Sequence, residues 1–229
     1  VLLIVSTTTN IWLTTRTNHT QLHFIDVGQG DACLVTTSKG STILIDTGGN
    51  DGNWDLGSNV LLPYLRYLGV KQIDLLILSH GHNDHSQAAL SMTNKLPIKN
   101  VLFHPNCSST HIDELKKLLP VHTHLNVTSN KSLQLDDCTL EILHVPSESK
   151  NDNDSLVLKL NSNGYSAIFT GDIEQVHEQM LVGKLGRANI LKVAHHGSKT
   201  STSDNFMREV NPNIAIISCG TNNKFGHPN

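Results

Sequence analysis

Four potential metal-binding side chains lie within six residues of one loop. The run Ser79-His80-Gly81-His82-Asn83-Asp84-His85 follows a continuous apolar segment and precedes a stretch with helical spacing. In an extended segment His80 and His82 can point the same way, while Asp84 and His85, at the start of a helix, can point toward a second centre. This spacing predicts a site for two metal ions. The alternative is a polar turn in which Asp84 caps the helix and the histidines are incidental.

Two further strand ends offer what a dinuclear site still needs. In Thr170-Gly171-Asp172 a carboxylate follows an apolar strand, and its two oxygens can bridge two cations about 4 Å apart. Asp172 is therefore the predicted bridging ligand, although an Asp after Gly is by itself typical of a turn or a helix cap. In the run 192–198, we expect one imidazole to complete the second metal site and the other to contact substrate. We assign His195 to the metal and His196 to catalysis, and the residues alone leave the opposite assignment open.

A third aspartate is predicted to support the site from outside. In Ile45-Asp46-Thr47-Gly48-Gly49, Asp46 could accept a hydrogen bond from a ligand histidine or from the loop backbone, which would fix the tautomer of the imidazole. The alternative is an Asp that only starts a glycine turn. Asp26 and Asp31 flank the turn at 27–30, where we expect them to bend the chain, and a role in the site is the weaker alternative.

The order of apolar runs predicts the elements that bring these loops together. Strands are expected at 22–27, 32–36, 42–45, 74–78, 101–103, 140–145, 156–160, 167–170, 190–194 and 214–218. Helices are expected at 59–69, 85–92, 112–119, 174–185 and 204–210. Strand-rich runs at both ends with helices between them predict an α/β fold, a four-layer αββα sandwich of two packed sheets with helices outside.

Composition limits how such a chain could hold a substrate. With 17 Lys and Arg against 20 Asp and Glu, the 229 residues carry a net charge of −3, so no broad basic surface for nucleic acid or membrane is indicated. An anionic substrate must be held locally. The 14 histidines stand out, because imidazole is the commonest protein metal ligand. The four cysteines are far apart, which excludes a disulfide scaffold and a thiolate zinc site and predicts free thiols.

Together these motifs resemble the metallo-β-lactamase fold superfamily. Four segments further resemble the hydrolase domain of the ComEC family of DNA-uptake channels: His23 through Ala32, Ser155 through Leu158, Phe169 through Glu174 and Lys192 through Thr202. The resemblance covers residues 20–229 and implies a metal-dependent nuclease that acts on DNA during uptake, on the strand that is not imported. It also implies a membrane channel domain in the same polypeptide, a position on the extracellular face of the membrane, and no nucleotide cofactor.

The ends of the chain carry two expectations of their own. Residues 1–13 are apolar but too short and too rich in threonine to cross a bilayer alone. Under the resemblance, residues 1–19 are a lead segment that ends a preceding membrane helix, and residues 20–229 are the hydrolase domain, truncated at its C-terminus.

One segment departs from the superfamily pattern. Many members place another histidine for the first metal just before the strand at 155–158, where this chain has Lys150-Asn151-Asp152-Asn153-Asp154. The nearest upstream imidazole is His144, which we expect to be a partly buried strand residue. Oxygen ligands from the loop would then complete the first site and favour manganese over zinc, and the residues leave both metals open.

The predicted chemistry is hydrolysis with two divalent cations. They would activate water near neutral pH and offset the charge that develops on a phosphodiester. Asp84 could also orient the water, and the spare imidazole, Lys199 or His227 could contact the substrate or protonate the leaving oxygen. Lys199 could equally be a plain exposed lysine. Two other functions stay open: a free-standing hydrolase of small esters, such as a phosphorylcholine esterase or lactonase-like enzyme, and a DNA-binding module without turnover.

Overall fold

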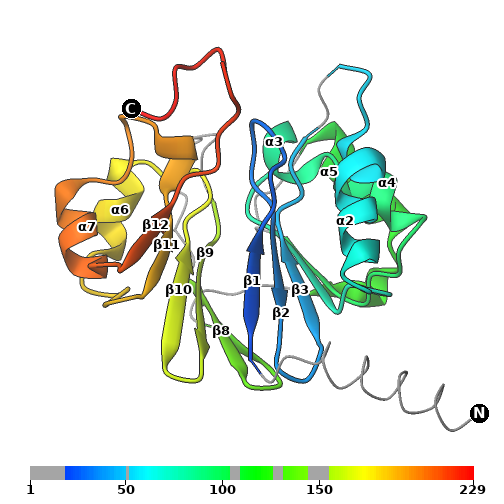
Figure 1. The fold of residues 1–229 in the computed structure, drawn as a ribbon, viewed down its shortest axis with the longest axis horizontal. Helices are drawn as coiled ribbons and strands as arrows, with labels where there is room; N and C mark the ends of the chain where they lie inside the picture. The colour runs from blue at the N-terminus through cyan, green and yellow to red at the C-terminus, as the bar shows by residue number, and fades with distance from the viewer. Residues whose placement is uncertain (1–18, 50–51, 104–108, 126–130, 144–154) are drawn as a thin grey trace, which may run out of the picture.

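The computed structural model describes residues 19–49, 52–103, 109–125, 131–143 and 155–229. Two six-stranded sheets pack face to face, and helices cover the outer face of each sheet (Figure 1). This arrangement is the four-layer αββα sandwich that the sequence predicts. The predicted lead segment lies outside the described residues, except for His19.

The first sheet follows the order of the chain from β1 to β6. An antiparallel meander opens it, and three strands parallel to β3 complete it. The strands are β1 (Gln21–Phe24), β2 (Cys33–Thr36), β3 (Thr42–Ile45), β4 (Leu75–Leu78), β5 (Val101–Phe103) and β6 (His124–Leu125). The helices on this side are η1, a π-helical turn (Gly57–Leu61), α2 (Leu62–Tyr67), α3 (Asn83–Ser86), α4 (Ala89–Thr93), α5 (Thr110–Leu118) and the 3₁₀ turn η2 (Val121–Thr123).

The second sheet has the order β12-β11-β10-β9-β8-β7. Its first four strands along the chain are antiparallel, and its last two are parallel to β10. The strands are β7 (Lys131–Leu135), β8 (Cys138–Leu143), β9 (Val157–Ser162), β10 (Tyr165–Phe169), β11 (Ile190–Lys192) and β12 (Ile214–Ile216). On its outer face lie α6 (Gln175–Leu181) and α7 (Asp204–Val210), and a 3₁₀ turn, η3 (Ala194–Gly197), follows β11.

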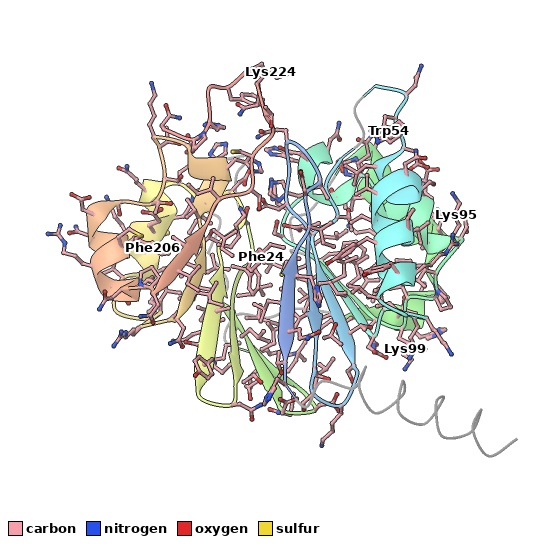
Figure 2. All side chains as sticks on the ribbon, in the orientation of Figure 1. Phe24, Trp54, Lys95, Lys99, Phe206 and Lys224 are labelled. Atoms are coloured by element: carbon pink, nitrogen blue, oxygen red, sulfur yellow. The ribbon has the colours of Figure 1, made fainter. Side chains whose placement is uncertain are left out.

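Alternation along the strands divides the apolar side chains into layers. On β3, Ile43 and Ile45 belong to the layer between the sheets, whereas Leu44 packs under the helices of the first sheet. This is the period of two that a strand buried on both faces requires. Phe24 stacks on Phe169 between the sheets at 6.1 Å, and Phe206 packs in a third layer beneath α6 and α7 (Figure 2). The buried apolar side chains therefore form three layers, one between the sheets and one under the helices on each side.

The observed elements differ from the predicted ones mainly at their ends. The helix predicted at 85–92 is divided into α3 and α4, and the helix predicted at 174–185 ends at Leu181. β6 and β7 were not predicted, because β6 has two residues and β7 is a largely polar edge strand. Cys33 and Cys138 are buried free thiols and Cys219 is a half-buried one. Within the described ranges, no helix is both long and apolar enough to cross a membrane.

Candidate metal centre

The predicted site residues follow four parallel strands at the same end of the molecule. Asp46 follows β3, His80 follows β4, Asp172 follows β10 and His196 follows β11. Because the carboxyl ends of parallel strands open at one edge of a sheet, side chains from each sheet meet there. The packing of the two sheets then brings both edges together. The geometric expectation that three distant loops gather in one place is confirmed by the clusters described next.

One cluster combines His80, His82 and Asp172, and we call it the first donor group. A nitrogen or oxygen atom from each residue lies within 4.8 Å of the others. The rings of His80 and His82 are 4.5 Å apart between centroids, and His80 Nε2 is 3.8 Å from Asp172 Oδ2. The alternating histidines thus face one point, as the extended spacing predicts.

A second cluster, the second donor group, combines four buried residues: Asp31, His85, Asp172 and His196. His85 Nε2 lies 3.1 Å from Asp172 Oδ1, and His196 Nε2 lies 3.6 Å from Asp172 Oδ2. Asp84 adjoins the group, with its Oδ2 atom 3.3 Å from His196 Nε2. Asp172 therefore belongs to both groups, which is the position expected of a ligand shared by two cations.

The chemistry of these atoms fits divalent cations. Nine buried side-chain nitrogen or oxygen atoms of the described residues lack a hydrogen-bond partner, and six of them are in or beside the two donor groups: His80 Nε2, His85 Nε2, His196 Nε2, His195 Nδ1, Asp31 Oδ1 and Asp172 Oδ1. Buried polar atoms are nearly always hydrogen-bonded, so a concentration of exceptions marks a place where another partner binds. Imidazole nitrogens and carboxylate oxygens are ligands for zinc and for manganese.

Hydrogen bonds from outside the groups aim the imidazoles. His85 Nδ1 is 2.9 Å from Asp46 Oδ2, and Asp46 also accepts hydrogen bonds from the backbone N–H and the hydroxyl of Ser79 at 2.7 and 2.8 Å. Both kinds of partner expected for Asp46 are thus present. His196 Nδ1 is 2.9 Å from the Ser218 carbonyl oxygen, which can only accept. Nδ1 therefore carries the proton, and the Nε2 atom of His196 is left to face the donor group.

Asp31 is the residue that the sequence analysis placed differently, as a turn residue. The backbone N–H of Asp31 donates to the Asp84 carbonyl at 3.1 Å, so its turn lies directly against the histidine loop. Gly30 makes this approach possible, because its φ is +147° and a Cβ atom there would overlap the Asp84 carbonyl. Asp26 does bend the chain as expected, since its carboxylate accepts from Gly28 N at 3.0 Å.

Lys192 is a second residue that the sequence analysis did not assign to the site. It is 4% exposed, its ammonium group forms an ion pair with Asp31 Oδ2, and it donates to the Val193 carbonyl at 2.9 Å. A lysine inside an otherwise apolar strand is the sequence signal for such a buried pair, because an ammonium group is rarely buried without a partner.

Charge interactions decide the protonation of the buried groups. Burial alone would lower the pKa of His85, but the charge and close approach of Asp172 and the hydrogen bond to Asp46 hold it well above its usual value. Burial and the neighbouring His85 lower the pKa of His80 well below its usual value. For Asp172, burial is outweighed by the charge of His85, which holds the carboxyl pKa well below its ordinary range. The shared carboxylate is therefore ionised, and His85 carries a proton that a bound cation would have to displace.

The adjacent histidines take different positions in the turn after β11. His196 is buried in the second donor group, whereas the side chain of His195 is 23% exposed and its Nε2 atom is 4.0 Å from Asp172 Oδ2. Both residues have left-handed backbone angles, with φ of 49° and 53°, and this turn sends the second imidazole inward. The geometry thus places His196 in the second donor group and His195 outside it, whereas the sequence analysis assigned the metal to His195.

The remaining predicted residues fall in three places. His227 lies beside the site, with its ring centroid 5.8 Å from that of His195. Lys199 is exposed and lines an open groove between α6 and α7 with residues such as Gln175 and Arg208. His144 and residues 150–154 lie outside the described residues. Among the described residues, the first donor group has two imidazoles and one carboxylate.

Fold and donor set together define a class. The chain belongs to the metallo-β-lactamase superfamily, whose family model matches residues 25–221. In fold it is similar to MEM-A1, a subclass B3 metallo-β-lactamase from a soil metagenome library, with a TM-score of 0.56 at 14% identity over 80% of each chain.

Within this superfamily, the curated relatives of the chain include proteins of bacterial competence. The chain is 34% identical to ComE operon protein 3 of Bacillus subtilis, over 91% of this chain and 29% of that protein. It is 31% identical to competence protein ComA of Neisseria gonorrhoeae, over 89% of this chain and 27% of that protein. The family resemblance seen in the motifs is thereby confirmed, and the chain spans less than a third of the length of these relatives.

Proposed function

We propose that this domain is a dinuclear metal-dependent phosphodiesterase that cleaves DNA. The observation that carries the proposal is the position of Asp172, whose carboxylate is common to two donor groups of buried imidazole and carboxylate atoms. A pair of cations sharing one carboxylate is the arrangement used by many enzymes that hydrolyse phosphate esters. Competence relatives make DNA the phosphodiester that this chain would meet.

Each donor group would hold one divalent cation. His80, His82 and Asp172 would bind the first, and Asp31, His85, His196 and Asp172 would bind the second, with Asp84 adjoining it. Bound cations would supply activated water near neutral pH and offset the negative charge of the phosphodiester. The second group offers as many carboxylates as imidazoles, so it fits manganese as well as zinc.

The chain's own residues prepare this site. Asp46 and the Ser218 carbonyl hold the imidazoles of His85 and His196 in fixed directions, which removes the cost of ordering them when a cation binds. Asp84, half-buried at the rim, can orient a water molecule. Burial is outweighed by the close approach of His196, which lowers the pKa of Asp84 to about 2, so the carboxylate stays ionised at neutral pH. His227 is near enough to contact a substrate that reaches the site.

We further propose that residues 20–229 are the hydrolase domain of a larger membrane protein, preceded by the lead segment at 1–19. The relatives are more than three times as long as the matched region, which supports a polypeptide with additional domains. In that protein the channel domain would be the partner, and the hydrolase domain would act on the extracellular side. No nucleotide cofactor enters the proposed reaction.

The test is cleavage of end-labelled DNA by purified protein treated with chelator and then supplied with Mn²⁺ or Zn²⁺. Asp172→Asn keeps the shape of the side chain but removes the shared charge, and Asp113→Asn is the matched control, because Asp113 is exposed on α5. We expect metal-dependent cleavage by the wild type and by Asp113→Asn. For Asp172→Asn we expect background activity and loss of bound metal, measured by elemental analysis.

Two outcomes would overturn the proposal. If the metal-loaded wild type hydrolyses small esters but no DNA, the protein is an esterase. If it binds DNA without hydrolysing either substrate, it is a binding module.

A further inference from the structure

The loop formed by residues 220–227 is built around one side chain, and we call it the Asn223 loop. Asn223 Nδ2 donates to the carbonyl oxygens of Gly220 and His227, both at 2.8 Å. Its Oδ1 atom accepts from the backbone N–H groups of Phe225 and His227 at 3.1 and 3.0 Å. The amide thus uses both donor hydrogens and both acceptor positions inside the loop. A loop of irregular backbone thereby keeps a defined shape.

The Asn223 loop is fastened to both halves of the molecule at the rim of the metal centre. Gly220 N donates to Gln29 Oε1 at 3.0 Å, in the turn that also carries Asp31. Just after the loop, Asn229 N donates to the Gly197 carbonyl at 2.8 Å. Gly197 has a φ of +79°, and a Cβ atom there would be 2.8 Å from Pro228 Cβ, so the chain presses on the His195-His196 turn. Figure 1 shows this segment, in red, at the same end as the strand ends of the site.

A line of rings leads from the donor groups to solvent along this loop. The ring of His227 lies 6.5 Å from that of His196, and the ring of Phe225 is stacked on His227 at 5.7 Å with an angle of 15°. Phe225 is 55% exposed, and Lys224 Nζ lies over its ring at 5.0 Å from the centroid, on a side chain that can turn aside for a stacked base. The loop therefore holds an aromatic face and a cation outward while His227 faces the site. Burying apolar area in the core does not explain this placement, since more than half of the Phe225 side chain contacts water.

We propose that Phe225 is a stacking platform for an unpaired nucleobase close to the phosphodiester being cleaved, and that Lys224 contacts a backbone phosphate of the same strand. This inference rests on the proposed nuclease function and names its substrate class as single-stranded DNA. Aromatic side chains bind single strands by stacking with any base, because every base has a π-face. In a duplex those faces are already stacked on neighbouring bases.

The charge of the chain supports the same assignment. A net charge of −3 gives no general attraction for a polyanion, so affinity for DNA must come from local contacts. Stacking on Phe225 is independent of the phosphate charge and therefore suits this surface. Lys224 adds one positive charge at the point where the strand would leave the metal centre.

The experiment compares two single strands of equal length, oligothymidylate and a strand made only of abasic sugar-phosphate units. Equilibrium affinity is measured by fluorescence anisotropy in chelator, where no cleavage occurs, and kcat/KM is measured with added Mn²⁺. The variants are Phe225→Ala and Phe225→Trp. Tyr67→Ala is the matched control, because Tyr67 is 84% exposed at the end of α2, away from the strand ends of the site.

We expect Phe225→Ala to weaken binding and lower kcat/KM about 5- to 100-fold for oligothymidylate, the range that stacking one base contributes. On the abasic strand the same variant should match the wild type, because there is no base to stack. Phe225→Trp should retain binding, and Tyr67→Ala should change neither strand. Lys224→Ala should lower affinity for both strands at low salt, since its contact is with phosphate.

The proposal is overturned if Phe225→Ala matches the wild type on oligothymidylate or if it loses affinity equally on both strands. Failure of the nuclease function has a different signature, namely no cleavage of either strand by the metal-loaded wild type. The anisotropy measurement still decides the stacking role in that case, because it does not depend on hydrolysis. Phe225 is exposed, so its replacement should leave thermal unfolding unchanged, and this is checked for every variant.

Discussion

At the carboxyl ends of the parallel strands, Asp31 and Asp172 each keep a buried oxygen atom that no hydrogen bond satisfies among the described residues. At the opposite end of the sandwich, the carboxylates are satisfied several times over. Asp74 accepts hydrogen bonds from Thr42 N at 2.9 Å, from Gln72 Nε2 at 3.1 Å and from Lys99 Nζ at 2.7 Å. The same residue type thus stands in two contrasting environments within one domain.

A second carboxylate at the far end shows the same saturation. Asp137, in the turn between β7 and β8, accepts from Thr20 Oγ1, Ser38 N, Ser162 Oγ and Asn163 Nδ2 at 3.1, 3.3, 3.0 and 2.9 Å. Side-chain hydrogen bonds with Ser38, which contributes most, and with Ser162 and Thr20 lower the pKa of Asp137. Its partners are hydroxyl, amide and backbone groups that tie the strand ends together. The far end therefore uses its carboxylates for stability.

Backbone conformation separates the two ends in the same way. At the far end the left-handed residues Asp136 and Asn163 sit in hairpin turns, where Asp and Asn are common. At the site end, two consecutive residues, His195 and His196, both take left-handed angles, and each costs free energy. Unsatisfied polar atoms and strained backbone therefore coincide. This coincidence is what distinguishes a ligand-binding end from a structural end.

The largest effect on the site end is expected when the two adjacent histidines are replaced one at a time. His196→Ala removes a buried imidazole from the second donor group, so we expect one bound cation in place of two. The loss of activity should exceed the 10- to 100-fold that removing a hydrogen-bond partner of a ligand typically costs. Native mass spectrometry counts the cations, and DNA cleavage gives the rate.

His195→Ala is the matched control, because it removes the neighbouring imidazole from the same turn. It should leave two cations bound. The opposite result, with the cation lost in His195→Ala and kept in His196→Ala, would restore the assignment made from the sequence.

A smaller effect is expected from Asp46→Asn. The Asn amide would donate to His85 Nδ1, which moves the imidazole proton to Nε2, the atom that faces Asp172. Asn tolerates the left-handed backbone angle at this position, where φ is 56°, so the turn should survive. Metal affinity should fall by about 10- to 100-fold, as measured by titration calorimetry with Mn²⁺. An unchanged affinity would show that Asp46 does not fix the tautomer.

The fold could be predicted from sequence wherever local signals were strong. The bounds of β3, β5 and α7 match their predicted ranges. Ser203 caps the start of α7 with a side chain that accepts from Phe206 N, and Asn211 caps its end in the left-handed conformation. Continuous apolar runs and caps of this kind act within a few residues. The two-residue β6 gives no such signal, because its pairing with β5 depends on the tertiary structure.

The site residues likewise divide into those with a local sequence signal and those placed by tertiary contacts. The loop from His80 to His85 could be found because four potential ligands lie within six residues, and Asp172 because it follows an apolar strand. Asp31 could not, since its contact with the His85 loop exists only after two loops far apart in sequence meet through the close approach at Gly30. Sequence also could not show which of the neighbours His195 and His196 faces the donor group, because the backbone angles of their turn decide it.

The smallest effect is expected from a substitution at the far end, Asp74→Asn, and it concerns the free energy of unfolding of the metal-free protein. Burial would raise the pKa of Asp74, but hydrogen bonds from Lys99 and Thr42 outweigh it and lower the pKa below its usual value. A carboxylate with a lowered folded-state pKa stabilises the fold above its unfolded pKa, about 4, and this contribution disappears as pH falls through the folded value. Asp74→Asn should therefore lower the free energy of unfolding by about 1–2 kcal/mol at pH 7 in chelator.

The difference between wild type and Asp74→Asn should shrink as the pH falls below about 4, where the wild-type carboxyl group takes up its proton. Urea unfolding at pH 7 and at pH 3 measures it. Lys99→Ala should cost less than Asp74→Asn at pH 7, because the Lys99 side chain is 53% exposed and exposed ion pairs contribute little. A constant difference across this pH range would mean that Asp74 acts through the shape of its hydrogen bonds rather than through its charge. In that case the two ends of the sandwich would differ only in whether their carboxylates are satisfied.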